Sequence, residues 1–221
     1  GIPTIASLSD DHIARAYCLG RGLPAESLHH LYFTDEWVKW IGEMGWTYKL
    51  VEDNAPRLII PWFSRTGDLL GAQCRRIDVT GKESRYITLK NKDADDTMKI
   101  YGVERLDFHK PIFVVEGPLD SWFLPNCVAA MGADLLRIHD NIMYSYNATY
   151  IWDNEPRNKD ICKHIEEAIY RKLKVVIWPD GLQEKDLNDM AQAGLNVPEI
   201  VQQHTYQGLR AELEFSRFAK C

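Results

Sequence analysis

The sequence has little that would support a disulfide framework or a zinc centre. Its five cysteines are odd in number, lie far apart and form no Cys-x-x-Cys pair. Its seven histidines form neither His-x-His nor His-Glu-x-x-His. Scattered thiols are typical of proteins in a reducing cytosol, and histidine-based metal chemistry has no support. A cytoplasmic protein without disulfides is therefore expected.

Long apolar runs and an excess of positive charge are also missing. No stretch approaches the roughly 20 apolar residues of a membrane span, and no secretory signal opens the chain. We therefore expect no membrane partner. The formal net charge of −6 argues against a protein coated with basic groups, although a local basic groove suffices to bind nucleic acid. The chain begins with Gly1 rather than Met, which indicates a trimmed fragment or a processed protein.

The chain divides into a helical opening, a strand-rich middle and a final part in which strands and helices alternate. Over residues 7–46 the pattern favours helices, with Ser9 as a first cap and Pro24 opening a second helix over residues 24–33. Strands are expected over residues 58–63, 69–75, 85–88, 112–115, 127–130, 149–152 and 175–178, and an amphipathic helix over residues 160–173.

Alternation of this kind predicts an α/β fold whose parallel sheet is flanked by crossover helices. We place a domain boundary near residue 107. Residues 1–107 would form a mixed α+β N-terminal subdomain, residues 108–205 the α/β domain, and residues 206–221 a C-terminal helix. With 221 residues the chain is long enough for such a division.

Carboxylates stand at the carboxyl ends of two neighbouring predicted strands. Glu116 comes directly after Ile112–Val115, and Asp153 and Glu155 come after residues 149–152. The period of two along a strand places Asp153 and Glu155 on the same side. Three neighbouring carboxylates repel one another unless a cation lies between them, and hard oxygen ligands favour Mg²⁺ or Mn²⁺. The structural alternative for Glu116 is an ordinary turn acid.

Four more acids could complete or tune a metal shell, some of them through waters. Asp120 lies four residues after Glu116, and Asp180 follows the last predicted strand. Asp186 and Asp189 open a helix. Asp186 also reads as a helix N-cap, and Asp189 as an exposed first-turn acid that suits the helix dipole.

These acids together resemble the Toprim domain, which bacterial-type DNA primases share with topoisomerases and some nucleases and repair proteins. The resemblance is carried by Glu116-Gly117 with Asp120, by Asp153 with Glu155, and by KDLND at residues 185–189. Upstream, residues 70–76 (LGAQCRR), 84–88 (SRYIT) and 99–103 (KIYGV) resemble three primase motifs in the expected order. The match extends over roughly residues 56–194.

The chain is most similar to the RNA-polymerase domain of T-even-type phage primases. DDHIARAYCLGRGLP at residues 10–24 resembles the opening of the phage polymerase domain. GPLDSWFL at residues 117–124 and WDNEPRNKD at residues 152–160 resemble T-even-type sequences. The fold that this resemblance implies is a Toprim-type parallel sheet with flanking helices, preceded by a mixed α+β subdomain.

The resemblance implies a DNA primase, a nucleotidyltransferase that synthesises short RNA primers on single-stranded DNA from ribonucleoside triphosphates with Mg²⁺ or Mn²⁺. Glu116, Asp153 and Glu155 would be the catalytic, metal-binding acids. A replicative helicase is an implied partner, and the host cytoplasm is the implied location if a phage encodes the protein. Such primases usually carry an N-terminal zinc-binding domain, and this chain has no zinc-ligand spacing.

The resemblance also implies contacts with nucleotide and DNA. Arginine suits phosphate through its forked donors, and tyrosine can stack on bases of a single strand. The ordinary alternatives are a basic strand edge for the upstream arginines and simple solvation for Arg157 and Lys159. The nucleotide- and DNA-binding candidates are Arg75, Arg76, Arg85, Tyr86, Lys90, Tyr101, Arg157, Lys159 and Lys185.

Two departures from the family pattern concern the acidic motif. Asp153-Asn154-Glu155 replaces Asp-x-Asp, which keeps the charge and adds one methylene. Pro156 and Arg157 stand where many cellular primases have Ala-Gly, which leaves the local turn open. Two other functions remain alternatives: a metal-dependent Toprim nuclease or topoisomerase-like module, and a non-catalytic nucleic-acid-binding subunit.

Overall fold

The chain folds as two compact units, Gly1–Met98 and Lys99–Cys221. The computed structural model describes residues 1–46, 54–78, 86–92, 94, 99–132, 134–140 and 146–221. Tyr101 forms an isolated bridge with Ala129, so the start of the second unit is tied to its sheet. The domain boundary expected near residue 107 stays a prediction.

The first unit opens with short helices rather than two long ones. Its elements before the main strands are η1 (Ile5–Ser7), α1 (Ile13–Gly20), η2 (Ala25–His29), β1 (Tyr32–Thr34) and α2 (Trp37–Glu43). The cap expected at Ser9 is wrong: His12 is the N-cap of α1, and its Nδ1 accepts a hydrogen bond from Ala14 N–H at 3.1 Å.

The helix expected over residues 24–33 is also wrong at its end. The 3₁₀-helix stops at His29, and Tyr32–Thr34 pairs antiparallel with the next strand. Tyr and Phe fit a pleated, half-buried surface, so sheet pairing overrides the helical pattern here.

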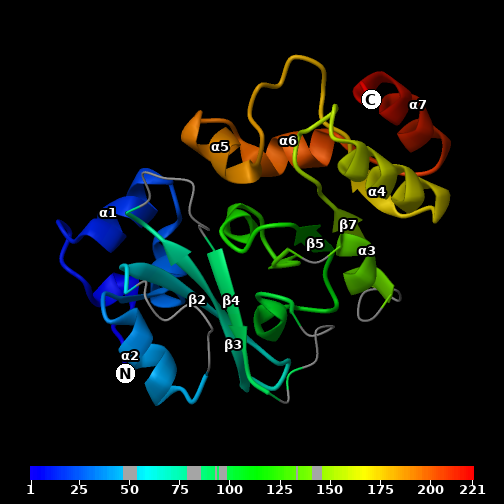
Figure 1. Ribbon diagram of the computed structural model, residues 1–221. Helices are drawn as coiled ribbons and strands as arrows, with labels where there is room; N and C mark the ends of the chain where they lie inside the picture. Colours follow the sequence, from blue (N-terminus) through cyan, green and yellow to red (C-terminus); the bar gives the residue numbers. More distant parts are fainter. Residues whose placement is uncertain (47–53, 79–85, 93, 95–98, 133, 141–145) are drawn as a thin grey trace. The chain divides into compact units, whose positions relative to one another are not determined.

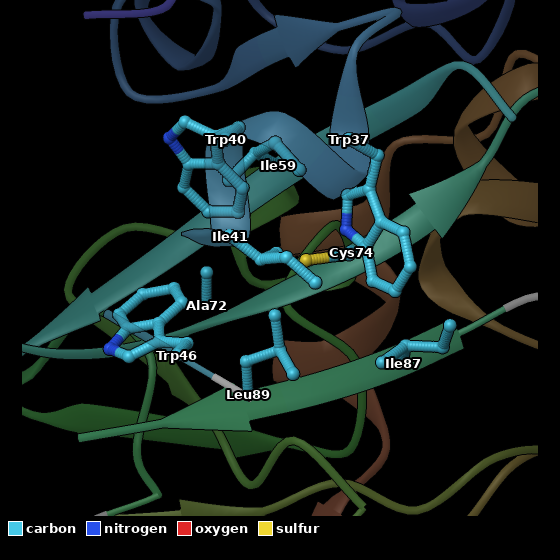
Figure 2. Packing of buried hydrophobic residues seen from close by; sticks show 9 residues of the cluster. All are labelled: Trp37, Trp40, Ile41, Trp46, Ile59, Ala72, Cys74, Ile87 and Leu89. Atoms are coloured by element: carbon cyan, nitrogen blue, oxygen red, sulfur yellow. The ribbon is translucent and has the colours of Figure 1, made fainter. Parts of the chain in front are cut away.

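The sheet of the first unit has the order β1-β2-β3-β4, and all its pairs are antiparallel. The strands β2 (Arg57–Phe63), β3 (Leu69–Arg76) and β4 (Tyr86–Lys90) confirm the three predicted there. Helix α2 covers one face: Figure 2 shows Trp37, Trp40 and Ile41 with Trp46 among the apolar side chains of these strands. The strand members of this cluster are Ile59, Ala72, Cys74, Ile87 and Leu89.

The opposite face of this sheet is marked by an indole ring that lies across a glycine. A Cβ at Gly71 of β3 would collide with the ring of Trp62, its partner on β2. Trp62 is fully buried. The glycine in the primase-like Leu-Gly-Ala sequence of this strand is therefore also explained by packing, because it leaves room for the Trp62 ring.

The second unit confirms the predicted parallel sheet. Its order is β6-β5-β7-β8-β9, in which the first four strands are parallel and β9 is antiparallel to β8. The strands are β5 (Ile112–Val115), β6 (Cys127–Ala129), β7 (Ala148–Tyr150), β8 (Lys174–Val176) and β9 (Thr205–Tyr206). The helices are η4 (Val103–Arg105), η5 (Asp120–Phe123), α3 (Leu135–Ile138), α4 (Lys159–Tyr170), α5 (Leu187–Gln192), α6 (Val197–Gln203) and α7 (Leu209–Phe218).

Helix α4 has one buried apolar face, formed by Ile161, Cys162, Ile165, Ala168 and Ile169. This confirms the amphipathic helix expected after the acidic motif. The C-terminal helix α7 packs against α4 (Figure 1). None of the helices in the described ranges is long and apolar enough to span a bilayer.

Candidate active site

Glu116 and Asp153 meet at the carboxyl ends of adjacent parallel strands. Glu116 directly follows β5, and Asp153 lies three residues beyond the end of β7, which pairs with β5. The backbone N–H of Asp153 donates a hydrogen bond to Oε1 of Glu116 at 3.1 Å. The convergence that the sequence predicts for these two residues is therefore present in the geometry.

Gly117 lets the Asp120 carboxylate lie close to the backbone. A Cβ at this position would collide with the Asp120 carboxylate. Asp120 in turn accepts a hydrogen bond from Asn188 N–H of α5 at 3.0 Å, through its other oxygen. The Glu-Gly pair thus lets η5 turn back close to the strand end, which brings Asp120 beside α5.

Glu155 reaches the same region through Lys185. The Lys185 ammonium lies 2.5 Å from Oε1 of Glu155 and 3.5 Å from Oδ2 of Asp153. One cation contacts both acids, so Asp153 and Glu155 lie on the same side, as the period of two predicts. Asn158 donates a hydrogen bond to the other oxygen of Glu155 at 2.7 Å. Glu155 is therefore held from two directions.

Asn154, the central residue of the acidic motif, anchors the loop that carries Lys185. Its side-chain amide donates to the carbonyls of Leu182 and Glu184, each at 3.0 Å. Its backbone N–H donates to the carbonyl of Lys185 at 2.7 Å. Three hydrogen bonds from one residue thus fix residues 182–185 against residues 153–155.

The charges of the site shift the pKa values of its acids in opposite directions. Burial, together with repulsion from Glu116, raises the pKa of Asp153 to about 7. Burial also raises the pKa of Glu116. The Lys185 ammonium lowers the pKa of Glu155, and this pairing raises the pKa of Lys185 itself. Two partly buried acids that resist ionisation in the same place are typical of a site that holds a cation.

The donor set suits a hard divalent ion, but the present geometry is not a ready-made metal cage. In the parts of the chain that the structure describes, no group of three or more His, Cys, Asp or Glu side chains is arranged to hold a metal ion. The Lys185 ammonium instead lies against two of the three predicted ligands. A carboxylate pair that holds an ammonium offers the oxygen ligands that Mg²⁺ and Mn²⁺ prefer.

Of the four additional acids, two lie close to Glu116 and Asp153. A small pocket is lined by Glu116, Asp120, Asp153 and Asp186 together with apolar side chains. Asp186 is the N-cap of α5, where it accepts from Asp189 N–H at 2.7 Å. Asp189 is an exposed acid of the first turn of α5. Asp186 is thus a helix cap and Asp189 an exposed first-turn acid, as the structural alternatives held, and Asp186 lines the pocket as well.

Asp180 lies apart from this pocket. It pairs with Lys220 at 3.4 Å, and its side chain is 78 % exposed. It lines a different pocket, with Trp178, Tyr206 and Arg217. Asp180 follows β8 as predicted, but its chain turns away after Pro179, so the structure does not place it with Glu116.

In the first unit, the predicted basic residues of β3 divide between the two faces of the sheet. Arg75 is paired with Tyr86, and its guanidinium lies over the Tyr86 ring at 4.7 Å. Tyr86, Thr88 and Lys90 are exposed, while the residues between them are buried. Arg75, Tyr86 and Lys90 therefore share one face.

Arg76, although a binding candidate like Arg75, lies on the opposite face of β3, so the two do not line one surface. Successive residues of a strand point to opposite faces, so Arg76 lies on the face that α2 covers. There it forms two hydrogen bonds to Asp78, at 2.9 and 3.1 Å. Its charge is already matched by a carboxylate. Arg85 lies outside the described residues.

The expectation that Tyr101 stacks on a base is also wrong. Its side chain is 1 % exposed, and its hydroxyl accepts a hydrogen bond from Trp122 at 3.0 Å. Arg105 lies over both rings, at 4.8 Å from Tyr101 and 4.4 Å from Trp122. Tyr101 is thus a core residue of the second unit. Arg157 and Lys159, by contrast, are exposed beside Glu155 and Asn158.

Sequence reasoning missed four residues that shape these sites. Tyr17 and Arg21 of the N-terminal motif extend the basic face: Arg75 lies 5.5 Å from the Tyr17 ring, and Arg21 lies 5.7 Å from it. Their position in a phage-primase motif was the available signal. Asn154 and Asn158 position Lys185 and Glu155. An asparagine directly before an amphipathic helix is a recognisable N-cap, but its bond to Glu155 has no sequence signal.

No family model matches this chain. The DNA primase of Enterobacteria phage T4 is 31 % identical to it over 220 residues, which are 96 % of this chain and 62 % of the phage protein. The chain is similar in sequence to a phage DNA primase. It thus spans a little under two thirds of that relative's length.

Solved structures agree with this resemblance at the level of the fold. The Aquifex aeolicus primase, with zinc-binding and RNA-polymerase domains, matches with a TM-score of 0.68 and 16 % identity over 94 % of this chain and 59 % of that one. A Pseudomonas aeruginosa DNA primase domain matches with a TM-score of 0.68 and 16 % identity over 93 % and 75 %. The DnaG primase catalytic domain bound to single-stranded DNA gives 0.66 and 17 % over 95 % and 76 %. The fold is that of a primase RNA-polymerase domain.

Proposed function

We propose that this chain is the RNA-polymerase part of a DNA primase, which synthesises short RNA primers on single-stranded DNA from ribonucleoside triphosphates. The observation that carries the proposal is the meeting of Glu116 and Asp153 at adjacent strand ends, with Glu155 joined to Asp153 through Lys185. The sequence similarity to a phage primase supports it over 96 % of the chain. A cytoplasmic location in the host cell and a replicative helicase partner are parts of the same proposal.

Glu116, Asp153 and Glu155 would hold Mg²⁺ or Mn²⁺. When bound, such ions neutralise the charge on phosphate oxygens and acidify an attacking hydroxyl. The residues fit this role because two of them are acids whose pKa burial raises. Asp120 and Asp186, which line the same pocket, would tune the site or contact it through waters.

The chain's own contribution is to hold the reactants and their charges in fixed positions. Primer synthesis joins a 3′-hydroxyl to the α-phosphate of a ribonucleotide and releases pyrophosphate, so negative charge must be held at fixed places. Lys185 brings a positive charge to the acids on a loop that Asn154 fixes. Arg157 and Lys159 are exposed next to the same acids, where they would contact phosphates.

The basic face of the first unit would bind the single-stranded template. Arg75 and Lys90 supply charge for phosphates, and the exposed ring of Tyr86 supplies a surface on which a base can stack. Tyr17 and Arg21 enlarge this face. Binding of single-stranded DNA by the related DnaG catalytic domain supports this assignment.

The test is a primer-synthesis assay with labelled ribonucleotides on single-stranded DNA, with Mg²⁺, with Mn²⁺ and with a chelator. We expect short RNA products with either ion and none with the chelator. A nuclease built on the same acids would instead cut the DNA in a metal-dependent way. Cutting without ribonucleotide incorporation would therefore replace the primase proposal with the nuclease alternative.

A further inference from the structure

One ammonium group lies where the proposed function needs a metal ion. The Lys185 ammonium contacts Glu155 at 2.5 Å and Asp153 at 3.5 Å. The Lys185 side chain is 53 % exposed, whereas those of Asp153 and Glu155 are 25 % and 30 % exposed. The acids are thus largely enclosed, and the cation reaches them from the solvent side on a flexible stem.

The position of Lys185 is set by the acidic motif itself. Asn154 lies between the two acids and holds the loop before Lys185 through the carbonyls of Leu182 and Glu184. The carbonyl of Lys185 accepts a third hydrogen bond from Asn154 N–H. Because Asn154 lies between the two acids in the sequence and anchors the loop, the backbone of Lys185 is held beside them. Its ammonium leaves the acids only if these contacts are lost or its own side chain rotates.

We propose that Lys185 is a built-in counter-ion of Asp153 and Glu155, and that a divalent ion binds only by displacing its ammonium. The inference rests on the proposed function, since it concerns the same acids. Lys185 keeps the metal-free acids from repelling one another, and it competes with Mg²⁺ or Mn²⁺ for their oxygens. Asn154 is the positioning residue that holds Lys185 in this competition.

The competition predicts the direction in which the affinity for Mn²⁺ changes when the ammonium is removed. A half-exposed ion pair gains little net free energy, so the metal loses only a modest part of its affinity to the ammonium. Removal of the ammonium should therefore tighten Mn²⁺ binding by about two- to fivefold. General damage to the site would weaken Mn²⁺ binding, so the direction of the change separates competition from a merely structural role.

The experiment titrates Mn²⁺ alone into the full chain and follows free Mn²⁺ by electron paramagnetic resonance. Lys185→Met removes the charge and keeps most of the stem. Asn154→Ala keeps the lysine and removes two of its loop's anchors. Lys163→Met is the matched control, because Lys163 is an exposed lysine on α4 of the same unit. We expect tighter binding in Lys185→Met, a smaller gain in Asn154→Ala, and no change in the control.

Thermal unfolding supplies a second readout. In a chelator, Lys185→Met should unfold at a lower temperature than the unchanged chain, because the acids lose their counter-ion. Saturating Mn²⁺ should raise its unfolding temperature by more than it raises that of the unchanged chain.

The outcomes separate the inference from the function beneath it. If the unchanged chain binds Mn²⁺ and Lys185→Met binds it equally well or more weakly, Lys185 is not a competing counter-ion, while the proposed metal site stands. If neither protein binds Mn²⁺, the metal site of the proposed function fails and the inference fails with it. Tighter binding confined to Lys185→Met and Asn154→Ala supports the inference.

Discussion

At the scale of single residues, the proposed site is defined by acids that are held close together against their mutual repulsion. Asp153 and Glu116 are adjacent, and each lies in partly buried surroundings. Glu155 pairs with the Lys185 ammonium, which lowers the pKa of its carboxyl group. Asp153 and Glu155 therefore differ in charge near neutral pH when no metal is bound, and this difference can be measured.

The raised pKa of Asp153 predicts how stability depends on pH in the absence of metal. Its pKa is about 7 in the folded chain, against 3.8 ordinarily, so the folded state binds this proton more tightly than the unfolded state. Stability is therefore greatest at low pH within this window and is lost as pH rises from about 4 through about 7. The raised pKa of Glu116 acts in the same direction.

Chemical denaturation in a chelator checks this prediction. Between about pH 5 and pH 7.5 the unchanged chain should lose on the order of 2 kcal/mol that Asp153→Asn keeps. Glu155 does not confuse the comparison, because its lowered pKa acts at more acidic pH. Equal losses in both proteins would show that Asp153 is ionised without cost.

At the scale of elements, the N-terminus of α4 links a helix cap to the acidic motif. Asn158 accepts hydrogen bonds from Asp160 N–H and Ile161 N–H, and it donates one to Glu155. Asn158→Ala should cost about 1 kcal/mol of stability through the lost cap. It should also lower primer synthesis several-fold, because Glu155 loses one of the two groups that orient it.

Asn196→Ala is the matched control for this prediction. Asn196 caps α6 and donates to Glu199, an exposed acid that lies outside the proposed site. The two variants should unfold at similarly lowered temperatures, and only Asn158→Ala should lose synthesis. A parallel loss of synthesis in both would reduce the role of Asn158 to that of an ordinary cap.

The β3 strand makes a second element-scale prediction, which concerns DNA. Arg75 lies on the face that exposes Tyr86 and Lys90, whereas Arg76 is matched by Asp78 on the other face. Arg75→Ala should weaken binding of single-stranded DNA about three- to tenfold and reduce the salt dependence by about one counter-ion. Arg76→Ala should change binding much less.

Fluorescence anisotropy with a labelled oligonucleotide at several salt concentrations measures both variants. Equal losses for Arg75→Ala and Arg76→Ala would contradict the division between the faces.

At the scale of the whole molecule, the strands and their acids could be predicted because their pattern is local. Apolar runs followed by acids predict β5 and β7, and apolar residues at helical spacing predict α4. The strand β1 could not be predicted, since its identity depends on pairing with β2 across more than twenty residues. The cap of α1 is His12 rather than the expected Ser9, also because of a contact distant in sequence: the His12 ring packs against Phe33 of β1.

The site residues also differ in whether a local pattern or a contact distant in sequence determines their position. Glu116, Asp153 and Glu155 follow strand ends, so their convergence is readable from the chain. The burial of Tyr101 depends on Trp122 and Arg105, which no periodicity connects to it. The contact of Lys185 with two acids depends on a loop that Asn154 anchors from another part of the chain. Such contacts require the fold.

The measurement that tests the central claim most directly is primer synthesis by Glu116→Gln. The substitution keeps the side chain's size and an oxygen that can accept from Asp153 N–H, so the fold should survive, as circular dichroism and thermal unfolding can verify. Glu212→Gln, which changes an exposed acid of α7, is the control. We predict that Glu116→Gln loses ribonucleotide incorporation by at least about 100-fold while Glu212→Gln retains it. Normal incorporation by folded Glu116→Gln would contradict the account.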